Sequence, residues 1–290
     1  MTATSRSPTL LRSPWTASFH GLLSEVEKNL LLVSPFVKLS KAQGIVAELE
    51  WRGVHQDIHV EVLTDLRPES ALNGSTDLEA FVEMGRRLPS FGLTHLPSLH
   101  AKVYVADRKT AIVTSGNLTD PGLSGNLEYG VIFTDEPTVE KIRTDFEKYA
   151  LLGARVPWED VRALLDETRE LKELLNKADR TIHRRARRAF KEKLAATRIR
   201  LLRHRAKGKT TSAIFSETIL FLLSKGPLTT VELHPLIQRL HPDICDDTIE
   251  LVIDGVHFGK KWKHRVRNAQ QWLKREGKIR FDGERWHIAS

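Results

Sequence analysis

Two short apolar segments joined by a polar turn, at residues 99–106 and 110–114, constrain the fold more than any other stretch. Side chains alternate between the two faces of a strand. The alternate positions predicted to face a core are Ala101, Val103 and Val105. Those predicted to share the other face are His100, Lys102 and Tyr104. A pair of neighbouring strands would therefore bring an imidazole and an ammonium to the same sheet edge as the Ser115-Gly116-Asn117 segment.

This set of groups suits one kind of chemistry. An imidazole acts as a nucleophile or a general acid/base near neutral pH. A lysine and an amide supply donors where negative charge develops, as on a transferring phosphoryl group. The set predicts attack on phosphorus without a bound metal. The alternative is a polar strand face with a capping loop, which a His-x-Lys triplet alone would favour. The full spacing from His100 to Asn117 favours the site.

The same residues resemble the HKD motif of the phospholipase D superfamily. The matching positions are His100, Lys102 and Asp107, followed by Ser115 and Asn117 of the trailing Gly-Ser-x-Asn. Thr114 departs from this pattern, since the family usually has glycine there. Downstream, residues 126–131 are similar to the Asn-x-Glu strand that closes such sites, with Glu128 available to hydrogen-bond an active-site residue. Without the resemblance, Glu128 would be an ordinary strand carboxylate.

The resemblance implies roles for these residues. Only one HKD motif is present, and single-motif members pair through a two-fold axis, which implies a homodimer with one composite site. One His100 would attack phosphorus to form a phosphohistidine, and the other would protonate the leaving oxygen. Lys102 and Asn117 would hold the non-bridging oxygens. Asp107 would orient its loop, and Ser115 would tune His100. No metal and no cofactor is implied.

Apolar segments alternate in period between helix and strand from residue 15 to about residue 156. The pattern predicts an α/β domain with a mixed sheet and helices on its faces. The phospholipase D-like resemblance implies the same layered sandwich. Residues 1–14 lack an apolar segment with a cleavage site and are expected to be a flexible leader.

Composition narrows the class of protein. The chain has 290 residues, long enough for two domains. Its single cysteine excludes an internal disulfide and favours a reducing cytoplasmic location. No apolar run approaches the roughly 18 residues needed to cross a membrane, so no membrane association is expected.

Positive charge is concentrated in one segment. Between Arg180 and Lys209 there are 13 Lys and Arg residues against Glu192 alone, whereas the whole chain carries +8. Residues 157–209 are predicted to be a basic helical linker that clamps a nucleic-acid backbone. A solvated helical face or a coiled-coil contact are the alternatives. The candidate contacts in this linker are Arg184, Arg185, Arg187, Arg188 and Lys191.

Residues 210–290 are predicted to form a winged-helix domain. We expect helices over 212–224, 231–240, 246–254 and 257–276, and a hairpin over 278–288. The segment from Trp262 resembles the winged-helix domain found beside Mrr-type restriction nucleases. Candidate DNA contacts are Lys260, Lys261, Lys263, Arg265 and Arg267. The spacing of His234, His241 and Cys245 fits no zinc site.

Together these features predict a metal-independent, dimeric DNA endonuclease of the restriction or defence type. A structure-specific repair nuclease, a ribonuclease, a phospholipase and a non-catalytic DNA-binding regulator are the alternatives. The phospholipase would leave the winged helix unexplained. The regulator would leave the complete set of His100, Lys102 and Asn117 unexplained.

Overall fold

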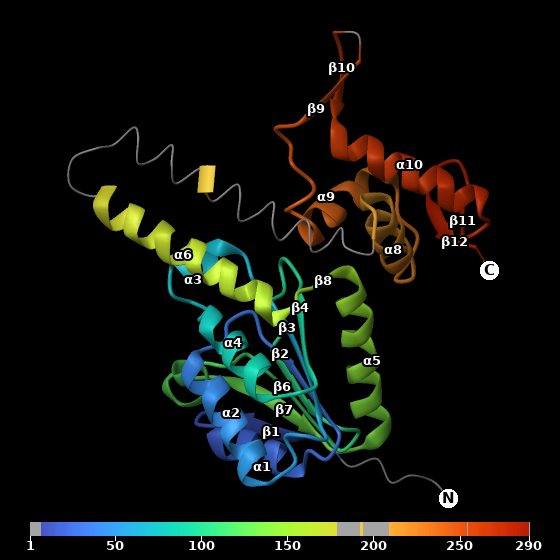
Figure 1. Cartoon of the computed structure of the whole chain (residues 1–290). Helices are drawn as coiled ribbons and strands as arrows, with labels where there is room; N and C mark the ends of the chain where they lie inside the picture. Colours follow the sequence, from blue (N-terminus) through green and yellow to red (C-terminus); the bar gives the residue numbers. More distant parts are fainter. Residues whose placement is uncertain (1–6, 179–191, 194–208, 254, 290) are drawn as a thin grey trace, which may run out of the picture. The chain divides into compact units, whose positions relative to one another are not determined.

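The computed structural model describes residues 7–178, 192–193, 209–253 and 255–289. They fall into two compact units, Met1–Arg200 and Leu201–Ser290. As the sequence predicted, the first unit is a mixed α/β sandwich (Figure 1). Its sheet has eight strands.

The sheet of the first unit has the strand order β1-β7-β6-β5-β2-β3-β4-β8. The strands are β1 (Thr9–Arg12), β2 (Asn29–Val33), β3 (His59–Thr64), β4 (Phe91–His95), β5 (Val103–Ala106), β6 (Thr110–Thr114), β7 (Tyr129–Phe133) and β8 (Ala154–Arg155). Strands β2, β3 and β4 are parallel, while β5, β6 and β7 form an antiparallel series. Consequently β2, β3, β4 and β6 end at the sheet edge where β5 and β7 begin. We call this edge the His100 edge.

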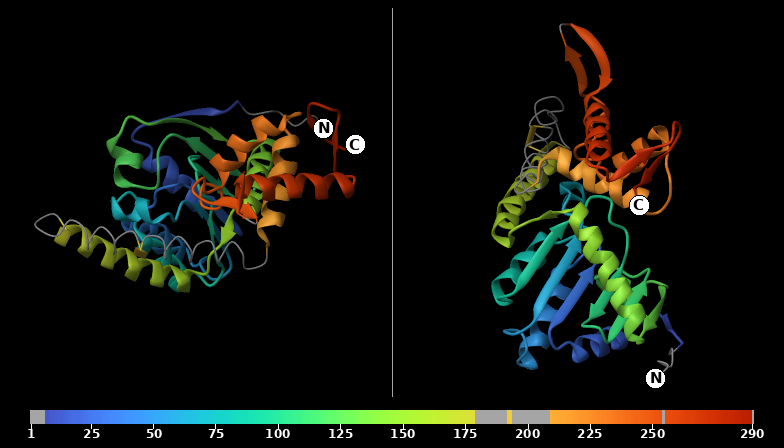
Figure 2. Two further views of the ribbon diagram at one scale, coloured as in Figure 1. Left: turned by 90° about the horizontal axis from the view of Figure 1, so that it is seen from above. Right: turned by 90° about the vertical axis from the view of Figure 1, so that its right-hand side faces the viewer.

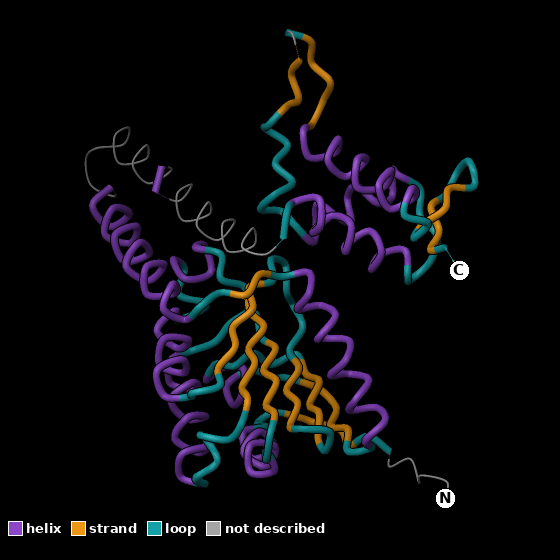
Figure 3. The backbone as a smooth tube through the Cα atoms, turned by 45° about the vertical axis from the view of Figure 1, so that its right-hand side comes forward, coloured by secondary structure: helices purple, strands orange, loops and turns teal. Residues whose placement is uncertain are grey.

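Helices cover both faces of the sheet (Figures 1 and 3). They are α1 (Thr16–Glu25), α2 (Leu39–Trp51), α3 (Pro68–Leu72), α4 (Leu78–Arg87), η1 (Pro121–Gly125), α5 (Glu136–Leu152) and α6 (Trp158–Ala178). Helix α5 lies on one face, and α1, α2, α4 and α6 lie on the other. None of the described helices is both long enough and apolar enough to span a bilayer.

Both faces of strand β5 are buried. Val103 and Val105 line the α5 side, as expected. Tyr104, expected on a polar face, is fully buried against Trp15 and Phe19 of the other layer. The polar face is therefore confined to the residues before the strand, because a central strand of a sandwich has helices on each side.

The N-terminal segment is not wholly a leader. Thr9–Arg12 forms strand β1, which pairs antiparallel with β7 and buries Leu11. Without β1, strand β7 would be an edge strand with unpaired backbone N–H and C=O groups. Such groups are a template for a further strand, which explains why so short a segment is ordered. The prediction of a flexible leader over residues 1–14 is wrong for residues 9–12.

Helix α6 belongs to the first unit, although the sequence placed its residues in a linker starting at 157. Val161, Leu164 and Leu171 of α6 are buried. Its first residue, Trp158, lies directly on Gly85 of α4, where a Cβ atom would come within 2.1 Å of the indole ring. The apolar face of α6 thus completes the layer formed by α2 and α4.

The second unit contains three helices and two hairpins among its described residues. These elements are α8 (Thr211–Leu223), α9 (Thr230–Leu240), β9 (Glu250–Ile253), β10 (Val256–Lys260), α10 (Lys261–Arg275), β11 (Ile279–Phe281) and β12 (Trp286–Ile288). A core of Phe215, Ile219, Leu233, Val266 and other apolar residues joins the helices. A capping box formed by Thr229 and Glu232 starts α9.

The predicted helix over residues 246–254 is wrong. Residues 250–253 are strand β9, which pairs with β10, and α10 begins at Lys261 rather than at residue 257. Both Gly255 and Gly259 adopt positive φ angles. The β-branched residues before the turn and these two glycines favour a bent hairpin over a continuous helix.

We expect Gly85→Ala to lower the free energy of unfolding by about 1–3 kcal/mol, because the new methyl group displaces Trp158. Chemical denaturation measures the change. Gly44→Ala on α2 is the matched control, since no atom lies within 4 Å of its Cβ position. That control should gain up to about 1 kcal/mol from helix propensity. Equal responses of the two variants would contradict the packing assigned to α6.

Candidate active site

Five of the six residues expected at the site lie around the His100 edge. His100 and Lys102 precede β5, Ser115 and Asn117 follow β6, and Glu128 precedes β7. The antiparallel order of the three strands brings these separate turns to one edge. Asp107 follows β5 and lies at the opposite edge.

Lys102 lies against His100. Its Nζ atom is 3.3 Å from Nε2 and 3.4 Å from Nδ1 of the exposed imidazole, and it donates to the His100 carbonyl oxygen at 2.7 Å. The Lys102 residue is only 6% exposed. Burial lowers the pKa of Lys102, and the nearby Glu128 carboxylate opposes that shift. A cation held this close to the imidazole is placed to bind an anionic substrate of His100.

Ser115 and Glu128 form a hydrogen-bonded pair. The Ser115 hydroxyl donates to Glu128 Oε2, and its oxygen accepts the Tyr129 backbone N–H at 3.1 Å. Asn126 Nδ2 donates to Glu128 Oε1 at 3.1 Å. Both carboxylate oxygens therefore have donors, which fixes the negative charge beside Lys102.

Ser13 also positions Glu128, which sequence reasoning missed. Its Oγ atom accepts the Glu128 backbone N–H at 2.6 Å, and the Ser13 backbone N–H donates to the Glu128 carbonyl oxygen at 3.2 Å. Strand β1 carries Ser13 to this position. The only available signal was a serine next to a proline in a segment expected to be mobile.

Asn117 lies beside Ser34, a second residue that sequence reasoning missed. Ser34 Oγ is 3.5 Å from Asn117 Oδ1, donates to the Phe36 carbonyl oxygen at 2.8 Å and accepts the Leu118 N–H at 3.2 Å. Ser34 is fully buried at the end of β2. A hydroxyl directly after the apolar run 30–33 was the available signal.

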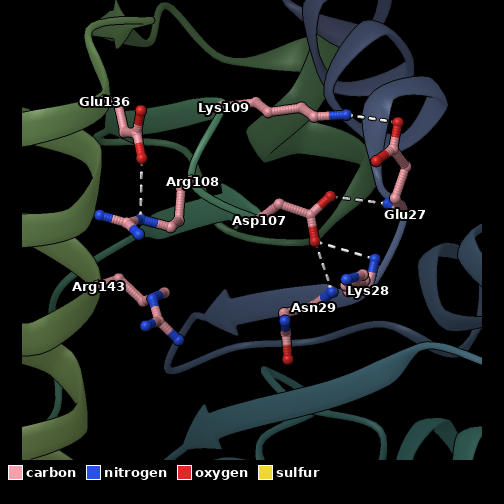
Figure 4. A pocket seen from close by; sticks show the side chains of 8 residues that line it. All are labelled: Glu27, Lys28, Asn29, Asp107, Arg108, Lys109, Glu136 and Arg143. Atoms are coloured by element: carbon pink, nitrogen blue, oxygen red, sulfur yellow. Dashed lines mark hydrogen bonds and ion pairs between the residues drawn. The ribbon is translucent and has the colours of Figure 1, made fainter.

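Asp107 is a structural anchor at the far edge. Its carboxylate accepts the backbone N–H groups of Glu27, Lys28 and Asn29 at 2.7, 2.9 and 2.7 Å (Figure 4). Its φ angle of 51° places it in the left-handed region that closes the β5–β6 turn. The hydrogen bonds of Asp107 therefore hold the segment before β2, and its position separates it from His100.

A cleft of about 460 Å³ opens beside His100 and Lys102. Its other walls are Thr114 and Ser115 of the β6 end and one side of α5. Helix α5 contributes Ile142, Asp145, Phe146 and Tyr149. The cleft gives an extended ligand access to the exposed imidazole while the Lys102 side chain forms part of its wall.

One known family model matches part of this chain. Residues 21–150 match the family model described as cardiolipin synthase, PLD-like domain. These residues form a phospholipase D-like domain. No curated protein sequence matches the chain.

Several solved structures are similar to the phospholipase D-like domain. Nuc of Salmonella typhimurium, a phospholipase D family member, is 18% identical over 52% of this chain and 99% of its own, with a TM-score of 0.41. NucT from Helicobacter pylori is 16% identical over 49% of this chain and 94% of its own, with a TM-score of 0.39. Phosphatidylserine synthase of Haemophilus influenzae Rd KW20 is 15% identical over 59% of this chain and 44% of its own, with a TM-score of 0.45.

The candidate nucleic-acid contacts fall into two groups. Those of the expected linker, Arg184, Arg185, Arg187, Arg188 and Lys191, lie outside the described residues. The others lie in the second unit, with Lys260 ending β10 and Lys261, Lys263, Arg265 and Arg267 on α10. Lys260 is paired with Glu250 at 3.3 Å. Lys261, Arg265 and Arg267 are exposed.

Asp107→Ala should lower the free energy of unfolding by about 1–3 kcal/mol, because three backbone donors lose their acceptor. Thermal and chemical denaturation measure this loss. Asp57→Ala, which removes an exposed carboxylate from another turn, is the control. If the two variants were equally stable, the anchoring role of Asp107 would be wrong.

Proposed function

We propose that this protein is a metal-independent DNA endonuclease that hydrolyses phosphodiester bonds through a phosphohistidine intermediate. The phospholipase D-like domain supplies the chemistry, and the second unit supplies DNA binding. The active form is a homodimer with one composite site, and its role is restriction or defence.

The observation that carries the proposal is the buried Lys102 ammonium beside the exposed His100 imidazole. A nucleophile and a fixed positive charge share one cleft, with the Asn117 amide on the next turn of the same edge. This arrangement matches what phosphoryl transfer demands, namely a nucleophile on phosphorus and charge stabilisation of the non-bridging oxygens.

The reaction proceeds in two balanced steps. An imidazole nitrogen of one His100 forms a bond to phosphorus as the bond to the leaving oxygen breaks, and His100 of the second copy donates the proton to that oxygen. Water then attacks the phosphohistidine, the P–N bond breaks, and the second imidazole takes the proton from water. Lys102 and Asn117 of both copies bind the non-bridging oxygens throughout.

Exposed apolar residues beside the site support the dimer. Leu127 is fully exposed, Tyr129 is 55% exposed, and both flank Glu128. Apolar side chains this exposed at the rim of a polar site are typical of a surface that a partner covers. A second copy packed there would bring its own His100 edge to the same cleft.

The second unit supports DNA as the substrate. Its three helices and the β11–β12 hairpin, joined by the Leu228–Trp286 bridge, fit a winged helix with α10 as the recognition helix. Residues 261–275 of α10 contain six Lys and Arg residues and no Asp or Glu. A phospholipid substrate is the alternative, because the matching family model is named for cardiolipin synthase. The single-sign charge of α10 favours nucleic acid.

Supercoiled plasmid incubated in excess EDTA should be cut by the wild-type protein and left intact by His100→Ala. The loss should exceed about a thousandfold, because the nucleophile itself is absent. His20→Ala, which changes an exposed histidine on α1, is the control and should cut normally. Cutting that requires added magnesium, or hydrolysis of phosphatidylglycerol vesicles in place of plasmid, would overturn the proposal.

Leu127→Asp should weaken the dimer and the nuclease activity together, since a composite site needs both copies. Sedimentation velocity measures the first effect and plasmid cleavage the second. Trp51→Asp is the matched control because Trp51 is equally apolar and 87% exposed but lies at the end of α2. A monomeric Leu127→Asp variant with full activity would refute the composite site.

A further inference from the structure

Helix α5 forms one wall of the cleft beside His100, and the proposed reaction gives this wall no role. The helix lies in front of the sheet in the right-hand view of Figure 2. Its residues in the cleft are Ile142, Asp145, Phe146 and Tyr149. These positions follow the i, i+3, i+4, i+7 spacing of one helix face. The wall is therefore a continuous stripe of α5.

The interior of the cleft is apolar and partly aromatic. Val103 of β5 pairs with Val113 of β6, so their side chains share the sheet face that α5 covers. On the helix side, the rings of Phe146 and Tyr149 meet edge to face with centroids 5.2 Å apart. Phe146 is buried, whereas Tyr149 is half-buried and lines the cleft. Because aromatic rings attract a further ring packed against them, the cleft suits a flat ring.

Charged groups of opposite sign lie at different levels of the cleft. Lys102 lies at the His100 edge, and α5 ends at that edge, because β8 directly after it pairs with the end of β4. Asp145 lies one turn before Tyr149 and is therefore about 5.4 Å farther from this edge. Its exposed carboxylate contacts Lys148 at 3.8 Å, and a pair this solvated is weak. The cleft thus offers a cation at the edge and a hydrogen-bond acceptor farther along α5.

A nucleotide within a nucleic-acid strand carries groups that match this order. Its phosphodiester would lie at Lys102, and its base would stack on Tyr149. An N–H group on the pairing edge of the base would then reach Asp145. An acyl chain is a poorer match, because it would cover the Asp145 carboxylate without supplying a donor. The volume of about 460 Å³ is within the range of sites that hold one small organic ligand.

We propose that the cleft binds the base of the nucleotide beside the scissile phosphate, with Tyr149 stacked on that base and Asp145 accepting a hydrogen bond from its pairing edge. This inference rests on the nuclease activity proposed above and adds a requirement on the substrate. In a duplex the pairing edge and both faces of a base are occupied, so the base must leave the stack to enter the cleft. The preferred substrate is therefore DNA that is unpaired at the cut.

Three DNA fragments that span a cut site mapped on plasmid test this requirement. The first is fully paired, the second has a non-complementary stretch at the cut, and the third also has a stable abasic analogue beside the cut. In EDTA the wild-type protein should cut the second fragment several-fold faster than the first, because no base pair has to be broken. It should cut the third about tenfold more slowly than the second, because one stacked base is missing.

Variants of Tyr149 assign this effect to the cleft. Tyr149→Ala should cut the second and third fragments at equal rates, whereas Tyr149→Phe keeps the ring and should retain the difference. The ratio of the two rates is taken within each variant, so a smaller folded fraction cancels. Leu151→Ala is the matched control, because it removes an exposed apolar side chain of α5 that does not line the cleft. This control should also retain the difference.

Several results would overturn the proposal. Equal rates with and without the base in the wild-type protein would show that no base binds beside the cut. A difference that persists in Tyr149→Ala would place the base elsewhere. Both results leave the nuclease proposal standing. Hydrolysis of phosphatidylcholine vesicles that is lost in Tyr149→Ala would assign the cleft to a lipid headgroup. A wild-type protein that cuts no DNA would overturn the nuclease proposal and this one together.

Discussion

Burial of the Lys102 ammonium at a sheet edge is the constraint on which the candidate site depends. A buried cation is costly unless negative charge or hydrogen-bond acceptors compensate for lost water. The His100 carbonyl oxygen and the Glu128 carboxylate supply part of this compensation. A phosphate in the cleft would supply more. The same desolvation that lowers the pKa of Lys102 therefore increases its attraction for an anionic ligand.

The Glu128 carboxylate can offset the cost of burying the Lys102 ammonium only if it stays in place. Residues distant in the sequence hold Glu128 there. Ser115 and Asn126 donate to its two carboxylate oxygens, and Ser13 bonds both its backbone groups. Ser13 reaches this position because β1 adds to the free edge of β7. The N-terminal strand thus contributes to the electrostatics of the site through one hydroxyl and one backbone amide.

Aromatic packing fixes the loop that carries Asn117. The Tyr104 hydroxyl donates to the Gly116 carbonyl oxygen at 2.9 Å, and Trp15 Nε1 donates to the Gly122 carbonyl oxygen at 2.6 Å. Burial raises the pKa of Tyr104 well above its usual value. The phenol therefore keeps its proton and remains a hydrogen-bond donor at physiological pH. Tyr104 therefore serves the site from the opposite layer of the sandwich, although its own side chain does not line the cleft.

Features set by neighbouring residues could be predicted from the sequence, whereas contacts between residues far apart in the chain could not. Strands β5 and β6 were predictable because alternation and turn residues lie within one short stretch, and the spacing from His100 to Asn117 is fixed by that hairpin. The roles of Ser13 and Ser34 were not predictable, since each acts through a contact to a residue more than 80 positions away.

Residues 246–254 were misassigned because a short apolar run has no decisive period. Gly255 and Gly259 distinguish a hairpin from a helix here only when their positive φ angles are known. The placement of helix α6 was also missed, because its amphipathic pattern is equally typical of a linker helix. Only the contact of Trp158 with Gly85 shows that α6 packs on the first unit.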